Sequence, residues 1–325
     1  MKILLDVVLL LVGFVLLIKG ADYFVEGSAA LAKRFHIPGV IIGLTIVAMG
    51  TSAPELAVSV SAGLAGANSL AISNVIGSNI FNLMVVLGVC AIMAPVAVEK
   101  GIIKRDFPYS LLATLLVGIF ISDLVFKGGV TGVSGTAQSG TIMRWEALIL
   151  MVFFIIYIYL TIRAAIKNRE EGDEIEALPL WKSLLFILGG IAAIIGGGQL
   201  VVIHAKSIAL FCGMSETLIG LTIVAIGTSL PELVTSIVAS KKGQNGMAVG
   251  NVVGSNIFNL LMILGVSGIL NPIYVTMESV IDISILMIVS ILVFLFCQSK
   301  KKLTRTEGIV MILIYIAYMA YAIIR

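Results

Sequence analysis

The chain alternates long apolar segments with short polar connections. Ten of the apolar segments are long enough to cross a lipid bilayer as helices, because about 20 apolar residues span its hydrocarbon core. They lie at residues 4–26, 40–66, 70–93, 107–126, 145–166, 181–204, 216–240, 246–270, 279–298 and 307–323. This pattern predicts an all-α membrane protein with ten transmembrane helices.

The second and third apolar segments recur as the seventh and eighth, at a constant offset of 177 residues. Residues 43–55 read GLTIVAMGTSAPE, and residues 220–232 read GLTIVAIGTSLPE. Residues 74–82 read NVIGSNIFN, and residues 251–259 read NVVGSNIFN. A duplication at one fixed offset indicates a repeated structural unit.

The repeat extends beyond these motifs. Gly13 matches Gly190 at the same offset, inside the first and sixth segments. The duplication therefore predicts two five-helix repeats, residues 1–166 and residues 181–325, joined by a cytoplasmic linker at residues 167–180. Because five is an odd number of crossings, the two repeats are expected to enter the membrane from opposite faces, as in many secondary transporters.

Charge and composition place the chain in a membrane and orient it. It is 59% hydrophobic and 12% charged, whereas soluble domains carry about 25% charged residues. Lysine and arginine are about three times as frequent in the loops on one side, and such loops face the cytoplasm. We therefore expect a lipid bilayer as partner, no nucleic acid, and both termini outside. The compact chain is typical of a prokaryotic plasma membrane.

Each motif copy places a glutamate, Glu55 or Glu232, inside an apolar segment. An ionised carboxylate there costs several kcal/mol, so it is expected to face a cavity, an ion or a basic partner. The four motif segments contain no lysine or arginine away from their ends. Lys19, in the first segment, is expected to reach the interface or to pair with Asp22 on its own helix. Neutralisation by a basic partner is therefore disfavoured.

Further oxygen-bearing side chains stand near each glutamate at helical spacing. A threonine and a serine precede each glutamate by four and three residues, so they share its helix face. In the following segment a serine and an asparagine, four residues apart, also share a face. The predicted side-chain ligands are Glu55, Glu232, Thr51, Ser52, Ser78, Asn82, Thr228, Ser229, Ser255 and Asn259.

A proline next to each glutamate predicts a break in the helix. Pro54 and Pro231 lack an N–H group, so the carbonyls of Gly50 and Gly227 lose their helical donors. Free carbonyls at this depth are tolerated only around a polar cavity or an ion. Thr45 and Thr222 lie further from the glutamates and are interpreted as packing residues or as bonding back to their own helices. Asn74 and Asn251 are assigned to neither role.

The predicted ligand set contains carboxylates, hydroxyls, amides and carbonyls, without clustered histidine or cysteine. This set suits a hard cation such as Ca²⁺, which takes about 6–8 oxygen ligands, or Na⁺. Metals that prefer thiolate or imidazole are disfavoured. Two carboxylates balance one Ca²⁺ or two Na⁺, and this balance is a physical basis for exchange at one site.

The motifs GTSAPE with GSNIFN and GTSLPE with GSNIFN resemble the α-repeats of the calcium/cation antiporters, the superfamily of the sodium/calcium exchangers. The resemblance covers essentially the whole chain. It implies inverted halves, ion sites on the ten side chains above, and the carbonyls of Ala48 and Ala225 as additional ligands. It also implies that the first and sixth helices slide together. Some members carry aspartate where this chain has Asn259, so stoichiometry and pH dependence are not carried over.

The sequence thus predicts an antiporter that exchanges Ca²⁺ for Na⁺ by alternating access, with no cofactor and no enzymatic activity. The alternative within the same fold is H⁺/Ca²⁺ exchange. An ion channel could use a similar ring of carboxylates and carbonyls, but the inverted repeats disfavour it. An intramembrane enzyme with glutamate as base would need a nearby histidine, metal or nucleophile, and the motif segments contain none of these.

Overall fold

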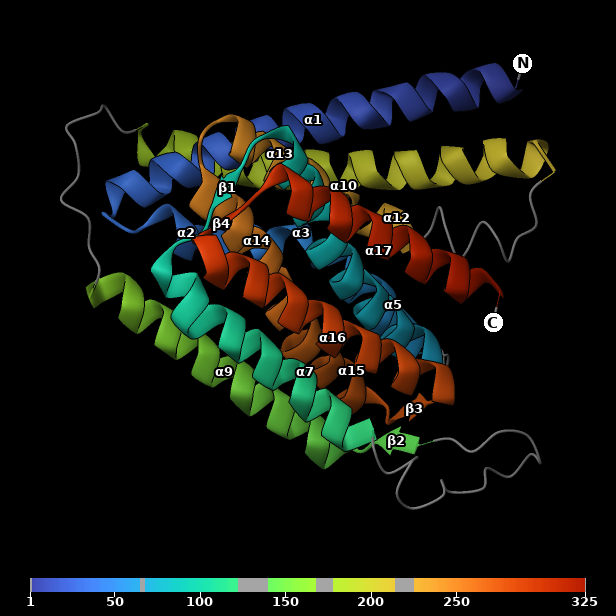
Figure 1. The fold of residues 1–325 in the computed structure, drawn as a ribbon. Helices are drawn as coiled ribbons and strands as arrows, with labels where there is room; N and C mark the ends of the chain where they lie inside the picture. Colours follow the sequence, from blue (N-terminus) through green and yellow to red (C-terminus); the bar gives the residue numbers. More distant parts are fainter. Residues whose placement is uncertain (1, 65–67, 122–139, 168–177, 214–224, 325) are drawn as a thin grey trace.

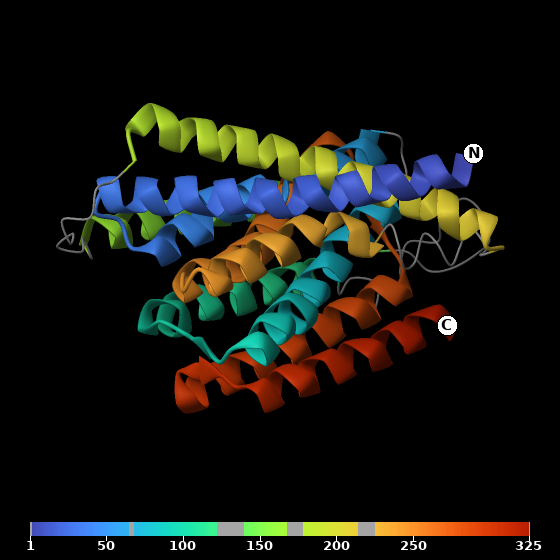
Figure 2. The ribbon, with the colours of Figure 1, turned by 90° about the horizontal axis from the view of Figure 1, so that it is seen from above.

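The computed structural model describes residues 2–64, 68–121, 140–167, 178–213 and 225–324. Most of these residues are helical, and the helices pack side by side in one body (Figure 1). The two longest, α1 (Lys2–Arg34) and α10 (Leu180–Phe211), lie together on one face of that body (Figures 1 and 2). They form an outer layer over the helices that carry the repeated motifs.

Glycines allow α1 and α10 to approach closely. A Cβ atom added at Gly13 would lie 2.9 Å from the carbonyl oxygen of Gly197, and one added at Gly190 would lie 2.8 Å from that of Gly20. Gly13 and Gly190 are repeat equivalents, as are Gly20 and Gly197. Small residues at such seams let helix backbones meet within a membrane.

The motif helix of each copy is broken at a serine. In the first copy the segments are α2 (Gly39–Ile42), the π-helical η1 (Gly43–Val47), α3 (Ala48–Thr51) and α4 (Ala53–Leu64). In the second copy they are α12 (Ala225–Thr228) and α13 (Leu230–Lys241). The first-copy segments bend by 47° at the break. The interruption predicted from Gly50 and Pro54 is confirmed, and it falls at Ser52, with φ −83° and ψ 8°.

The next helix of each copy lies at the centre of the body. The segments are α5 (Asn68–Phe81), η2 (Asn82–Val86) and α6 (Leu87–Met93), and α14 (Asn245–Ile257), η5 (Phe258–Ile263) and α15 (Leu264–Leu270). Ile72 and Val252 are fully buried there. π-helical turns occur at Asn82 and Asn259, and such turns are frequent at functional sites.

The remaining helices surround this centre. They are α7 (Phe107–Ile121) with the short η3 (Ile102–Asp106) before it, α9 (Arg144–Lys167), α16 (Met277–Lys300) and α17 (Arg305–Ile324). Two short antiparallel strand pairs tie the loops: β1 (Val96–Ala97) pairs with β4 (Lys302–Leu303), and β2 (Gly140–Ile142) pairs with β3 (Ile273–Val275).

The outer helices expose large apolar side chains. Leu5 of α1, Ile155 of α9 and Leu313 of α17 are each more than half exposed, as expected where the surrounding solvent is lipid. Over the described residues, seven helices are long and apolar enough to span a membrane, or eight if the bent pair counts as one span. The expected spans at 107–126 and 216–240 run into undescribed residues, so the count of ten stays a prediction.

Both termini lie at the same end of the molecule (Figures 1 and 2). Lys33 and Arg34, in the last turn of α1, lie at the opposite end. That both termini face the outside of the membrane stays a prediction.

Candidate ion site

The two glutamates occupy equivalent positions at the starts of helices. Glu55 lies in the first turn of α4, Glu232 lies in the first turn of α13, and both side chains are fully buried. A helix N-terminus carries a partial positive charge that favours a nearby carboxylate. The break at each serine therefore creates a helix start in the interior, and that start supports a charge without a basic residue.

Hydrogen bonds between the copies join the two glutamates into one centre. The Oγ of Ser52 donates to Oε1 of Glu232 at 2.8 Å, and the Oγ of Ser229 donates to Oε1 of Glu55 at 3.1 Å. Each serine stands three residues before the glutamate of its own copy, yet it bonds to the glutamate of the other. In the part of the chain described here, no lysine, arginine or histidine pairs with either carboxylate.

Five buried oxygens of the predicted ligands have no hydrogen-bond partner among the described residues. Leaving such an atom unsatisfied costs about 1–3 kcal/mol, and native proteins have few of them. These five oxygens are Oε2 of Glu55, Oε2 of Glu232, Oγ of Ser78, Oδ1 of Asn82 and Oδ1 of Asn259. All five can donate lone pairs to a cation, so the arrangement is suited to holding a positive charge.

The other predicted ligands differ in how far they are already engaged. Ser255 Oγ lies 3.5 Å from Oε1 of Glu232 and 3.4 Å from the carbonyl oxygen of Ala48. Thr51 is fully buried, and its hydroxyl lies 3.0 Å from Oδ1 of Asn251 and 3.1 Å from the carbonyl oxygen of Val47.

The remaining members of the predicted set are less defined. Thr228 is half-buried. Ala225 begins α12, and its side-chain surroundings lie outside the described residues. The carbonyl of Ala48 accepts the N–H of Ser52 at 3.0 Å, and the hydroxyls of Thr51 and Ser255 also approach it, at 3.3 Å and 3.4 Å. A cation at this oxygen would therefore compete with the two hydroxyl donors.

The asparagines that the sequence left unassigned hold the motif helices together. Nδ2 of Asn74 donates to Oγ of Ser59 at 3.0 Å, and Nδ2 of Asn251 donates to Oγ of Ser236 at 2.9 Å. Each links the two motif helices of its own copy. Thr45 donates to the carbonyl of Ile41 at 2.7 Å, as predicted, and Thr222 lies outside the described residues.

Sequence reasoning missed Asn79 and Asn256. Each donates its Nδ2 to the backbone carbonyl of the other, at 3.2 Å in both directions. They were overlooked because helical spacing assigns to the ligand face only the serine before them and the asparagine three residues after. Their presence in both copies of the motif was the available signal.

A second polar cluster joins the two long helices. Nδ1 of His204, on α10, lies 2.8 Å from Oδ1 of Asp6, on α1, and Oγ of Ser207 donates to Oδ2 of Asp6 at 2.8 Å. Asp6 is buried. The pair spans 198 residues of sequence, and no local pattern indicated it.

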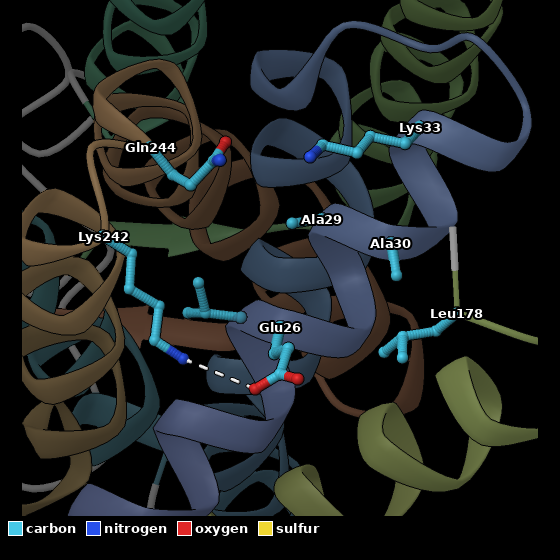
Figure 3. Close-up of a pocket in the computed structure, with 8 residues that line it drawn as sticks. Glu26, Ala29, Ala30, Lys33, Leu178, Lys242 and Gln244 are labelled. Atoms are coloured by element: carbon cyan, nitrogen blue, oxygen red, sulfur yellow. Dashed lines mark ion pairs between the residues drawn. The ribbon is translucent and has the colours of Figure 1, made fainter. Parts of the chain in front are cut away.

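A cavity of about 310 Å³ lies near the C-terminal end of α1, between α1, the residues that follow α13, and Leu178, two residues before α10 (Figure 3). Its lining combines opposite charges: Glu26 and Lys33 from α1 and Lys242 from the end of α13. Nζ of Lys242 lies 3.9 Å from Oε2 of Glu26 and 3.3 Å from Oδ1 of Asp22. Of the two roles expected for Lys19, pairing with Asp22 is not seen among the described residues, because Lys242 packs against that carboxylate. The other role, reaching the membrane interface, stays a prediction. The cavity contains none of the predicted ion ligands.

Comparison with known proteins identifies relatives of this chain. The sequence model of the family described as "Sodium/calcium exchanger protein" matches residues 5–163 and 182–324. The chain is 38% identical to the putative antiporter CaxA of Alkalimonas amylolytica, over 96% of each chain. It is 32% identical to the sodium/calcium exchanger MaX1 of Methanosarcina acetivorans, also over 96% of each chain.

The fold has a close match among solved structures. A structure of the sodium-calcium exchanger NCX_Mj soaked with Na⁺ and Sr²⁺ superposes with a TM-score of 0.82 at 34% identity, covering 98% of this chain and 99% of that one. The family match spans both motif copies and most of the chain between the termini. This chain therefore belongs to the sodium/calcium exchanger family of integral membrane antiporters.

Proposed function

We propose that this protein exchanges Ca²⁺ for Na⁺ at one site shared by Glu55 and Glu232. The observation that carries the proposal is the pair of buried carboxylates. Each accepts a hydrogen bond from the serine of the opposite copy, and each has one oxygen without a partner among the described residues. Two carboxylates supply two negative charges, which one Ca²⁺ or two Na⁺ would balance. The same centre therefore suits either cargo but not both at full occupancy.

The oxygens around the carboxylates would complete the coordination. Ser78, Asn82 and Asn259 contribute oxygens that have no hydrogen-bond partner within residues 2–64, 68–121, 140–167, 178–213 and 225–324. The hydroxyls of Thr51, Ser52, Thr228, Ser229 and Ser255 and the carbonyls of Ala48 and Ala225 are the further ligands we propose. Ca²⁺ takes about 6–8 oxygens, and this set is large enough to supply them for Ca²⁺ or for Na⁺.

Coupling follows from the cost of an empty site. Two bare carboxylates enclosed in the membrane would carry an uncompensated desolvation penalty of several kcal/mol each. We infer that the site changes from opening at one face of the membrane to opening at the other only when cations occupy it. The closely packed α1–α10 pair is the element we propose to slide across the motif helices, since its glycine seam lets the two helices move as one body.

We also propose ten spans in two inverted repeats, in a prokaryotic plasma membrane with both termini outside. Equal helix bounds at the 177-residue offset support the repeats, as in α4 (Ala53–Leu64) and α13 (Leu230–Lys241). The shared location of the termini supports the orientation. The bacterial and archaeal relatives support the membrane type.

The alternative is H⁺/Ca²⁺ exchange through the same centre. It is favoured by one observation, that the two carboxylates have no basic partner among the described residues. Two protons would neutralise this pair as completely as two Na⁺, so geometry does not distinguish the two driving ions.

The test is Ca²⁺ uptake into liposomes that contain the purified protein. We expect an outward Na⁺ gradient at fixed pH and clamped voltage to drive uptake, and an outward choline gradient to drive none. Uptake that responds to a pH gradient but not to Na⁺ would establish the H⁺ alternative. Ca²⁺ uptake that responds to neither the Na⁺ gradient nor the pH gradient would refute antiport.

Replacing Asn259 with aspartate should make Ca²⁺ affinity strongly pH-dependent. Nδ2 of Asn259 donates to Oδ1 of Asn79 at 3.0 Å, and an ionised aspartate cannot donate. The lost hydrogen bond costs about 1 kcal/mol. An added charge about 4 Å from a cation gains about 4 kcal/mol even at an effective dielectric of 20. Affinity for Ca²⁺ should therefore rise as pH rises, by roughly tenfold or more.

The measurement is ⁴⁵Ca²⁺ binding by Asn259→Asp between pH 6 and pH 9, compared with the unmodified protein. The equivalent variant in the first copy, Asn82→Asp, should show a shift of the same sign if the site is symmetric. A profile that matches the unmodified protein would mean that residue 259 does not face the ion.

A further inference from the structure

We propose that Asn79 and Asn256 are positioning residues that turn the amide oxygens of Asn82 and Asn259 toward the transported cation. The inference rests on the proposed function, in which those two oxygens are ion ligands. It adds a set of ordered amides to the proposed site and gives a reason for the asparagine of each GSN motif.

Four asparagines, two from each copy, form a closed set of hydrogen bonds. Asn79 and Asn256 exchange bonds with each other's backbone carbonyls at 3.2 Å. Nδ2 of Asn259 donates to Oδ1 of Asn79 at 3.0 Å, and Nδ2 of Asn82 donates to Oδ1 of Asn256 at 3.2 Å. All four side chains are buried. The bonds obey the 177-residue offset, so the two halves of the set are equivalent.

The backbone carbonyls fix which way each amide faces. A carbonyl oxygen only accepts hydrogen bonds, so the atom of Asn79 that faces the carbonyl of Asn256 must be the donor, Nδ2. Oδ1 of Asn79 is then the atom that faces Asn259. Because Oδ1 accepts, Asn259 must present its own Nδ2 to it.

The ligand asparagines are thereby left with their oxygens free. Oδ1 of Asn82 and Oδ1 of Asn259 are buried and have no hydrogen-bond partner in the part of the chain that the structure describes. A flipped Asn259 would set two acceptor oxygens against each other and would turn an NH₂ group toward the cation. The network therefore disfavours the one orientation that would repel the cargo, and it does so in both copies.

Each positioning asparagine orients the ligand asparagine of the other copy. Asn79 stands three residues before Asn82 on the first-copy helix, yet it orients Asn259 of the second copy. Asn256 likewise orients Asn82. A residue that merely supported its own helix would affect the ligand of its own copy. The crossed pattern is therefore a property that a purely structural role does not share.

Double-mutant cycles test this pattern through ⁴⁵Ca²⁺ binding to the purified, detergent-solubilised protein. Asn79→Ala should raise the Kd for Ca²⁺ about tenfold, as expected for a lost buried hydrogen bond, and leave the number of sites unchanged. In a protein that already carries Asn259→Ala, the same change should add little. In a protein that carries Asn82→Ala, it should add its full tenfold.

The second-copy cycle is the matched control, with the partners reversed. Asn256→Ala should couple to Asn82→Ala and should add independently to Asn259→Ala. Thermal unfolding without Ca²⁺ verifies that each variant is folded. If Asn79→Ala does not fold, Asn79→Ser, which keeps a hydroxyl at that position, replaces it in the cycle.

The outcomes separate the two proposals. Independent effects for Asn79 with Asn259, or coupling of Asn79 to Asn82 instead, would overturn the positioning role while the ion site stands. An unchanged Kd in both Asn82→Ala and Asn259→Ala would show that neither amide touches the ion. That result would overturn this inference together with the amide part of the proposed site.

Discussion

Replacing either buried glutamate with glutamine should abolish Ca²⁺ transport, with uptake at least about 100-fold below that of the unmodified protein. Glu55 and Glu232 together supply two negative charges, and one substitution leaves only one against the two positive charges of Ca²⁺. An uncompensated buried charge costs about 3–5 kcal/mol, which corresponds to at least a hundredfold in affinity. The measurement is Na⁺-driven ⁴⁵Ca²⁺ uptake into liposomes.

The protein should still fold. Glutamine has nearly the same shape, and its oxygen can still accept the bond from Ser229 or Ser52 that the glutamate accepts now. A matched control is Glu146→Gln, a change at a buried glutamate whose Oε2 accepts the N–H of Met143 at the start of α9. The control should transport Ca²⁺ normally. Substantial uptake by Glu55→Gln or Glu232→Gln would contradict a site shared by both carboxylates.

Gly250→Ala should destabilise the protein by about 1–3 kcal/mol, the usual cost of overpacking. A Cβ atom at this position would lie 2.6 Å from the carbonyl oxygen of Val40 and 3.1 Å from the amide nitrogen of Leu44. Both are backbone atoms, so α14 must move away from α2 and η1. That movement would weaken the 3.0 Å bond between Thr51 and Asn251. The loss should appear as a lower midpoint of thermal unfolding in detergent, together with weaker Ca²⁺ binding.

Gly118→Ala in α7 provides the control, because a Cβ atom there meets nothing within 4 Å. Alanine is also up to about 1 kcal/mol better than glycine inside a helix. The control should therefore unfold at the same temperature or higher. If Gly250→Ala behaved like Gly118→Ala, the contact between α14 and the first broken helix would be looser than the structure indicates.

Much of the site could be predicted from sequence because its signals are local. The length of an apolar segment identifies a helix that can span the membrane, and a proline, which lacks an N–H group, breaks the helix that contains it. Both rules operate within a few residues, so the break before Glu55 and the back-bonded Thr45 followed from the chain alone. The repeated glutamate in an apolar segment was similarly visible, because its surroundings are its own neighbours in sequence.

The partners of these residues could not be predicted in the same way. Helical spacing tells which side chains share a face, and it gave Ser52 and Glu55 one face of a helix. Helical spacing does not indicate that Ser52 bonds to Glu232 of the other copy, or that Asn79 bonds to Asn259. The pairing of Asp22 with Lys242 in place of Lys19 has the same origin, since a contact across 220 residues depends on how the helices pack.

The sequence by itself determined that this chain is a duplicated membrane protein of the exchanger family, with one acid in each copy at a broken helix. Hydrophobicity, proline chemistry and a repeat are properties of residues near one another along the chain. Only the tertiary structure decided that Ser52 and Ser229 each bond to the glutamate of the other copy, and that Asn79 and Asn256 bond to each other. Those contacts depend on how two helices that are distant in the sequence pack against each other, and no pattern of neighbouring residues predicts that packing.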